Sequence, residues 1–214
     1  MTEYFFEGDL TEFPKKLPTP LKTPDLNDFI TGFLLGEGEI VSNTCRYITP
    51  FENFALWIKN CFERFELSGF IEYFPGKKSL NWHKEDTPEM WRFSTSIYSC
   101  LELFQKHWYH YRNRKIIRII KITPFVLFLL YLQYGYYYEF KGVKYVKIKD
   151  RTMTTTLRKI GVTDITCRKD YIQIKEPSQQ KFFTYLLSHD YSIPECYKRN
   201  FPSELLEGRS IFTS

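Results

Sequence analysis

The pattern of apolar and polar positions is most distinctive in residues 25–36. Apolar side chains cover most of a helix there, and Gly32 and Gly36 lie four residues apart on one face. Each glycine costs a helix roughly 1 kcal/mol relative to alanine, unless another backbone has to approach closely. The pattern therefore predicts a buried helix that packs against a second helix. Residues 124–133 are equally apolar and provide the predicted partner.

Both apolar stretches carry similar signals at their ends. Each opens with a Thr-Pro pair, at Thr23 and Thr123, which is typical of a helix cap followed by proline in the first turn. Each ends at a glycine. In the first stretch Glu37 lies between Gly36 and Gly38, where a sharp turn can present a carboxylate beside backbone carbonyls. Such a carboxylate can bind a hard cation such as Mg²⁺, and the alternative is an exposed carboxylate without a metal.

The rest of the chain alternates between helical and strand periodicity. Helices are predicted over residues 52–67, 99–112, 154–160 and 178–187, and strands or hairpins over residues 39–49, 69–74, 91–97, 143–149 and 165–175. A similar order occurs in both halves, which predicts an α+β fold, a pseudo-twofold pair of halves that meet along the two apolar helices.

The predicted organisation has three parts. Residues 1–22 are rich in proline and are expected to form an extended N-terminal arm. Residues 23–115 form the first half, and residues 116–214 form the second half with a C-terminal tail.

Composition supports a folded chain with a mildly basic surface. The 214 residues are 43% hydrophobic and 19% aromatic, which excludes a disordered chain and permits a substantial core. The net charge is +5, and residues 106–121 contain six Lys or Arg and no acid. A basic run of this kind is either an ordinary solvated face or part of a nucleic-acid-binding surface.

Cysteine usage and apolar run length bear on the compartment. The five cysteines are scattered without close pairs, which predicts reduced thiols and an intracellular, reducing location. The longest apolar run, residues 125–132, is far shorter than a membrane span, so no membrane association is expected. Four acids precede the first lysine, so no targeting peptide is visible, although an organelle such as the mitochondrion is compatible with the pattern.

The first apolar helix carries a resemblance to a known family. Residues 30–38, ITGFLLGEG, resemble the nine-residue motif after which the LAGLIDADG homing endonucleases are named, with Gly32 and Gly38 retained and Glu37 in place of the metal-binding aspartate. Single-chain members carry the motif twice, and residues 123–135 resemble a degenerate second copy. The resemblance extends from about residue 23 to residue 202. It implies two αββαββα halves, each with a saddle-like antiparallel sheet, packed on two central helices.

The resemblance also implies a chemistry that this chain departs from. Enzymes of the family hydrolyse both DNA strands with one acid from each motif helix and divalent metal between the acids and the phosphates. Glu37 would be one such ligand for Mg²⁺. The matching position in the second motif is Tyr134, preceded by Gln133, whose neutral amide oxygen would hold Mg²⁺ only weakly.

Two lysines are further candidates for catalysis. Lys115, just ahead of the second motif, lies in a segment that resembles one carrying an active-site lysine in the family. Lys198 lies in a tail that resembles the Ile-Pro…Tyr-Lys segment of single-chain members. If the protein is an active enzyme, its catalytic residues are expected to be Glu37, Lys115 and Lys198.

The predicted strands carry the candidate nucleic-acid contacts. Family members lay a sheet from each half along the major groove of DNA, and cationic, amide and aromatic side chains on the outer positions can contact phosphates and bases. The alternative is that these are the ordinary polar faces of half-buried strands. Together with the basic run, the candidates are Arg46, Arg92, Arg112, Arg114, Arg118, Tyr145, Lys147, Lys149, Arg168, Lys169, Tyr171 and Gln173.

Three functions follow as hypotheses. The first is a nucleic-acid-binding protein with an eroded catalytic centre, serving as an RNA-binding, maturase-like or ribonucleoprotein component. The second is an active or nicking homing endonuclease that recognises double-stranded DNA, and the third is a protein-interaction scaffold. The expected partner in the first two is structured RNA or double-stranded DNA, bound by a monomer with internal pseudo-symmetry.

Overall fold

The structure is a computed structural model that describes residues 24–76, 87–110, 113–114, 122–149, 153–207, 209 and 211–213. The first half contains α1 (Leu26–Leu35), β1 (Glu39–Val41), β2 (Thr44–Thr49), α2 (Glu52–Glu63), β3 (Gly69–Phe74), β4 (Met90–Thr95) and α3 (Cys100–Trp108), followed by β5 (Tyr109–His110) and β6 (Asn113–Arg114). The second half contains α4 (Pro124–Tyr134), β7 (Gly135–Phe140), β8 (Val143–Ile148), α5 (Thr154–Lys159), β9 (Ile165–Cys167), β10 (Ile172–Ile174) and α6 (Glu176–Leu186). The tail contains β11 (Ile193–Pro194), the 3₁₀ helices η1 (Glu195–Asn200) and η2 (Ser203–Leu205), and β12 (Ile211–Phe212).

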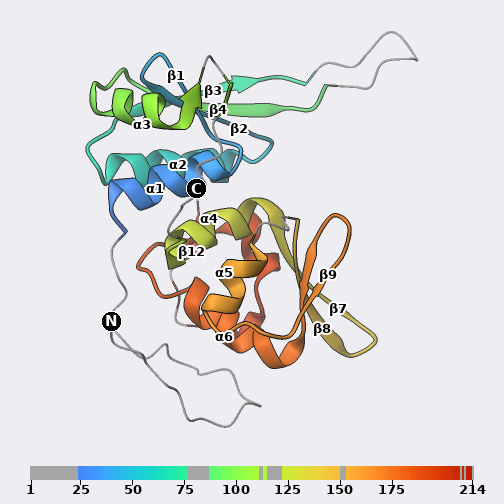
Figure 1. Ribbon diagram of the computed structural model, residues 1–214. Coiled ribbons are helices and arrows are strands. Elements are labelled where there is room, and N and C mark those ends of the chain that lie inside the picture. Colours follow the sequence, from blue (N-terminus) through green and yellow to red (C-terminus); the bar gives the residue numbers. More distant parts are fainter. Residues whose placement is uncertain are drawn as a thin grey trace, which may run out of the picture.

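The two halves share one topology. Each contains a four-stranded antiparallel sheet, in the orders β1-β2-β4-β3 and β7-β8-β10-β9, and each follows the element order αββαββα. Figure 1 shows the first half above the second, with α1 and α4 between them. The predicted α+β fold with two repeated halves is confirmed.

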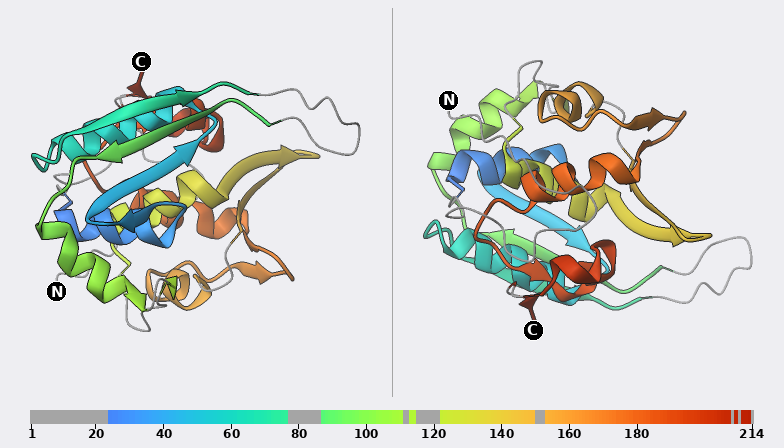
Figure 2. Two further views of the ribbon diagram at one scale, coloured as in Figure 1. Left: turned by 90° about the horizontal axis from the view of Figure 1, so that it is seen from above. Right: turned by 90° about the horizontal axis from the view of Figure 1, so that it is seen from below.

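The central contact is the pairing of α1 with α4, which also lie together in the two views of Figure 2. A Cβ added to Gly32 would lie 2.7 Å from Cδ1 of Leu129 and 3.2 Å from the backbone of Val126. A Cβ on Gly36 would collide with the amide of Gln133. The glycines of α1 thus admit bulky side chains of α4, as the pattern predicted, and the packing is asymmetric because α4 has no small residue at these positions.

The two central helices begin differently. The side chain of Thr123 accepts a 3.4 Å hydrogen bond from the backbone of Val126, which confirms the predicted cap of α4. In contrast, α1 begins at Leu26, and its cap is Asp25, whose Oδ1 accepts a 2.7 Å bond from the backbone of Asp28. The expectation of a cap at Thr23 is therefore wrong, because Asp25 accepts the hydrogen bond from a backbone N–H in the first turn of the helix.

Two helices are shorter than the periodicity predicts. Helix α2 ends at Glu63 instead of residue 67, because Glu66 turns the chain with a φ of 60° and Leu67 donates back to the carbonyl of Phe62. Helix α3 ends at Trp108, and Tyr109 and His110, which were expected to continue it, form β5.

The longest strand that was not predicted is β7. Strand β7 follows α4 directly and pairs along its whole length with β8. Its sequence, GYYYEF, lacks the alternation of polar and apolar residues that marks a half-buried strand, because tyrosine occupies both of its faces.

The C-terminal tail ties the two halves together. Trp57 of α2 donates a 2.9 Å bond from Nε1 to the carbonyl of Ser192, and the ring of Tyr197 packs edge-on against Phe54 with centroids 4.8 Å apart. The predicted arm, residues 1–22, and the predicted boundary between residues 115 and 116 lie outside the described residues. None of the helices that are described is long and apolar enough to cross a membrane.

Candidate nucleic-acid interface

The two motif helices meet at a glutamate and a tyrosine. Glu37 follows α1 and is exposed, and Tyr134 is the last residue of α4. The hydroxyl of Tyr134 donates a 2.8 Å hydrogen bond to Oε1 of Glu37. The two positions that the resemblance equates are therefore in direct contact, as a carboxylate and a phenol. We call these residues the Glu37–Tyr134 pair.

Gln133 holds the backbone of this pair in place. Its Oε1 accepts a 2.6 Å bond from the backbone N–H of Glu37 and a 3.0 Å bond from the hydroxyl of Tyr47, while its Nε2 donates to the carbonyl of Leu129. Burial is the largest cause that raises the pKa of Tyr47 far above its ordinary value, so this phenol stays a neutral donor. Both lone pairs of the Gln133 oxygen are thus in use.

The donor set is a poor match for Mg²⁺. Mg²⁺ requires near-octahedral oxygen coordination and usually takes one or two carboxylates together with waters or phosphates. Here one carboxylate already accepts a bond from Tyr134, and the amide oxygen of Gln133 already accepts two bonds. Across the described ranges, no three histidine, cysteine, aspartate or glutamate side chains gather as a metal site.

The first strand of each sheet begins next to this pair in the chain. Glu37 leads through Gly38 into β1, and Tyr134 leads directly into β7. The backbone N–H of Lys149, at the end of β8, donates a 2.9 Å bond to the carbonyl of Tyr134. The pair therefore lies where the helices pass into the first strand of each sheet.

The outer face of the first sheet carries Arg46 and Arg92, which the pairing register places on one side together with the exposed Ile48 and Phe70. Arg92 donates from Nε and Nη2 to Oε2 of Glu72, at 3.0 and 2.7 Å. The charge of Arg92 is therefore neutralised on the protein itself.

The outer face of the second sheet carries the other candidates. The register places Lys147 beside Gln173, and Tyr145 lies on the same side of β8. Lys147 lies near the ring of Tyr171, with Nζ 4.7 Å from the centroid. Lys149 is exposed and directly follows β8. Arg168 and Lys169 are exposed in the turn between β9 and β10.

Sequence reasoning missed two residues of this second face. Tyr136 and Tyr138 of β7 point to the same side as Lys147 and lie beside it. The run of three tyrosines directly after the second motif could have indicated them. If this run forms a strand, its first and third side chains must lie on the same face.

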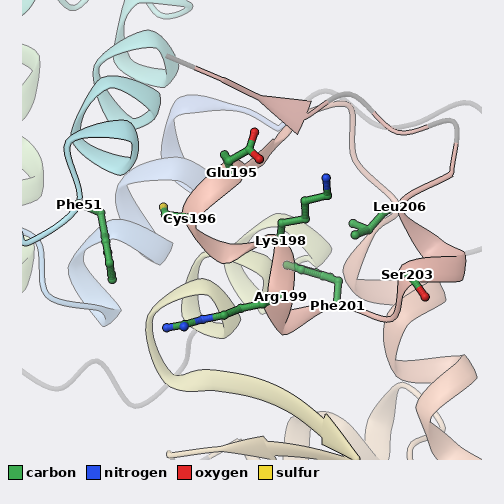
Figure 3. A pocket seen from close by; sticks show the side chains of 8 residues that line it. All are labelled: Phe51, Glu195, Cys196, Lys198, Arg199, Phe201, Ser203 and Leu206. Atoms are coloured by element: carbon green, nitrogen blue, oxygen red, sulfur yellow. The ribbon is translucent and has the colours of Figure 1, made fainter.

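Lys198 lies on η1, at the rim of an open pocket of about 530 Å³ (Figure 3). Lys198 and Arg199 are both exposed, and they point in different directions from η1. Lys115, Arg112 and Arg118 lie outside the described residues, and of Arg114 only the backbone is described, paired with Tyr109.

Comparison with known proteins identifies the architecture. No protein-family model and no curated protein sequence matches the chain. Among solved structures, the homing endonuclease I-WcaI bound to its DNA recognition sequence aligns over 81% of this chain and 84% of its own, with a TM-score of 0.57 and 13% identity. The chain has a homing-endonuclease fold.

Two further structures resemble the chain more loosely. The structure of I-DmoI in complex with DNA and Mn aligns over 76% of this chain and 96% of its own, with 17% identity and a TM-score of 0.40. The N-terminal LAGLIDADG domain of WhiA aligns over 88% and 93%, with 14% identity and a TM-score of 0.42. The likeness to solved structures concerns the fold.

Proposed function

We propose that the protein binds nucleic acid across the outer faces of its two sheets and does not cleave both strands of a duplex. The fold shared with a DNA-bound homing endonuclease and the cationic side chains on the outer faces support binding. The Glu37–Tyr134 pair supports the loss of double-strand cleavage, and this hydrogen bond is the observation that carries the proposal.

The chemical reason is the requirement for two acids. Cutting each strand needs a metal-held water and a neutralised leaving oxygen, so the family resemblance implies one carboxylate from each helix. A phenol carries no charge near neutral pH and binds Mg²⁺ poorly. Losing one metal-holding carboxylate removes several kcal/mol of charge stabilisation, hence several decades of rate.

The finer proposal is an RNA-binding role, as a maturase-like or ribonucleoprotein component, since a binding surface without a cutting centre suits a structural partner of RNA. The competing function is a nicking endonuclease that uses Glu37 with Lys115 and Lys198. The third function, a protein-interaction scaffold, would bind without a steep dependence on salt.

The test combines binding with cleavage. The nucleic acid that co-purifies with the protein from its native source would be sequenced and used as the probe in both assays. We expect binding that weakens steeply between about 50 and 200 mM salt, and no Mg²⁺-dependent double-strand cleavage.

Two variants separate the competing functions. Restored double-strand cutting by Tyr134→Asp supports an eroded endonuclease. Nicking that Glu37→Gln abolishes supports the nicking alternative. Efficient double-strand cutting by the unmodified protein would overturn the proposal.

A further inference from the structure

The outer face of the second sheet is a cluster of tyrosines around one lysine. Nζ of Lys147 lies 5.8, 4.6 and 4.7 Å from the ring centroids of Tyr136, Tyr138 and Tyr171, of which the first two belong to β7 and the third directly precedes β10. Tyr145 stacks on Tyr138 with centroids 5.2 Å apart and an interplanar angle of 21°. We call these four tyrosines with Lys147 the tyrosine face.

The rings of the tyrosine face are held in place but not covered. The opposite side of the same strands is buried, with Val146, Ile148 and Ile174 fully enclosed by the second half. All four rings are partly exposed, and Phe140 at the end of β7 is 58% exposed. A cation over one face of a ring helps to hold that ring in place, and the partial exposure of the four rings leaves surface for a further contact.

The charge of this face favours a polyanion. The strand residues on this side of the second sheet include no acid, since Glu139 alternates to the other side together with Tyr137. Lys147 lies among the rings. Lys149 is exposed and directly follows β8, the strand that carries Lys147. Its tyrosine neighbours raise the pKa of Lys147 above its ordinary value, so the lysine stays charged.

The outer face of the first sheet differs from the tyrosine face in its charge and in its aromatic rings. Its outer face carries the Arg92–Glu72 ion pair, so one of its two arginines is already neutralised. The exposed ring of Phe74 lies under the guanidinium of Arg92, 4.8 Å from its centroid, and this cation is the ion-paired one. The outer faces of the two sheets therefore differ in their free cations and in the rings beside those cations.

We propose that the tyrosine face binds unpaired bases by stacking, with Lys147 and Lys149 contacting the flanking phosphates. This inference rests on the proposed nucleic-acid-binding function and assigns its substrate class, a nucleic acid with a single-stranded segment. Bases in a duplex present only their edges in the grooves, whereas an aromatic ring needs the face of an unstacked base. Rings on a cationic sheet are the arrangement that binds single strands with little sequence preference.

Fluorescence anisotropy with short labelled probes tests the inference. The probes are a uridine-only RNA, a thymidine-only DNA and a DNA duplex of the same length. We expect Tyr138→Leu and Tyr145→Leu each to weaken single-strand binding by about 5- to 150-fold. Duplex binding should change by less than about twofold, since its affinity comes from phosphate contacts. Comparison of the RNA with the DNA shows which backbone is preferred.

Matched variants separate stacking from folding. Tyr138→Phe keeps the ring and should weaken single-strand binding much less than Tyr138→Leu does. Tyr73→Leu removes a tyrosine that is 50% exposed on β3, outside the tyrosine face, and should have no effect. Lys147→Gln should reduce the salt slope for single strands by about 0.7. Circular dichroism confirms that each variant is folded.

The outcomes distinguish this inference from the proposed function. Duplex binding as tight as single-strand binding, with both leucine variants unchanged, would overturn the stacking role and leave nucleic-acid binding intact. Absence of salt-dependent binding to every probe would overturn both.

Discussion

The hydroxyl of Tyr134 donates a 2.8 Å hydrogen bond to Oε1 of Glu37, which lies 97 residues earlier in the chain. The bond joins the ends of the two central helices. Gln133, the residue before Tyr134, accepts from the backbone of Glu37 at 2.6 Å, so two consecutive residues of α4 hold one residue of the first half. The family resemblance implies a metal ion between two acids at this place. In this protein the side chain and the backbone N–H of Glu37 are instead hydrogen-bonded to Tyr134 and Gln133.

Restoring the second acid should create a cation site. Tyr134→Asp replaces the phenol with a carboxylate beside Glu37, and we expect Mn²⁺ or Mg²⁺ to bind about tenfold more tightly than to the parent protein, because each added carboxylate strengthens an oxygen site. Isothermal titration calorimetry measures the affinity. Tyr138→Asp adds the same charge on the tyrosine face, away from Glu37, and should leave metal binding unchanged. Equal tightening in both variants would show that net charge alone is responsible.

The close approach of α1 and α4 predicts a stability cost at Gly32. Gly32→Ala places a Cβ 2.7 Å from Cδ1 of Leu129 and 3.2 Å from the backbone of Val126, so we expect a loss of about 1–3 kcal/mol in the free energy of unfolding. Urea denaturation measures it.

A double-mutant cycle tests whether Leu129 is the cause. Leu129→Ala alone should cost about 2–5 kcal/mol through the cavity it leaves. In that background Gly32→Ala should cost less, because the Cδ1 atom it meets is absent, with a coupling of about 0.5–3 kcal/mol. Strict additivity of the two substitutions would contradict the contact.

A buried histidine predicts a pH dependence of stability. His189 is 1% exposed, packs on the rings of Phe125 and Phe128, and accepts at Nδ1 from the backbone of Tyr191. Burial, and then the charge of Arg209, lower its pKa from 6.5 to about 3. Between these pH values the unfolded chain binds a proton that the folded chain does not. The free energy of unfolding therefore falls as the pH drops, by up to about 1.4 kcal/mol per pH unit.

Urea denaturation at about pH 7 and about pH 5 tests this dependence. The loss of stability at the lower pH should be smaller in His189→Leu, which has no imidazole to protonate. His107→Leu removes an exposed histidine of α3 and should keep the dependence of the parent protein. Identical pH dependence in all three proteins would exclude His189 as its source.

Releasing Arg92 should strengthen nucleic-acid binding. Glu72→Gln removes the carboxylate that holds this guanidinium, so one more cation can contact a phosphate, and the logarithmic salt slope should steepen by about 0.7–0.9. The free energy of unfolding should change by about 1 kcal/mol at most, because both side chains are partly exposed. Anisotropy titrations over a range of salt measure the slope.

An ion pair on α2 provides the control. Glu63 pairs with Lys59 at 2.8 Å, and Glu63→Gln changes the net charge by the same amount on a helix outside both outer faces. Its salt slope should match that of the parent protein. A slope as steep as that of Glu72→Gln would mean that overall charge, not Arg92, sets the affinity.

Much of the fold could be predicted from the sequence, because local periodicity determines it. The spacing of Gly32 and Gly36 within an apolar helix predicted a close helix partner, and alternation in residues 165–175 predicted a strand or hairpin, in which the structure buries Ile172 and Ile174. Strand β7 escaped because tyrosines occupy both of its faces, which removes the alternation on which strand prediction depends.

The sequence by itself determined the two motif helices, the repeated order of elements and the absence of an acid at position 134. Only the tertiary structure decided that Tyr134 bonds to Glu37, that Glu72 neutralises Arg92, and that Tyr138 and Lys147 share one face. The physical reason is distance along the chain. Periodicity reports which face of a segment is buried, whereas a hydrogen bond between residues 97 apart depends on how two helices pack, and packing is set by side chains from the whole core.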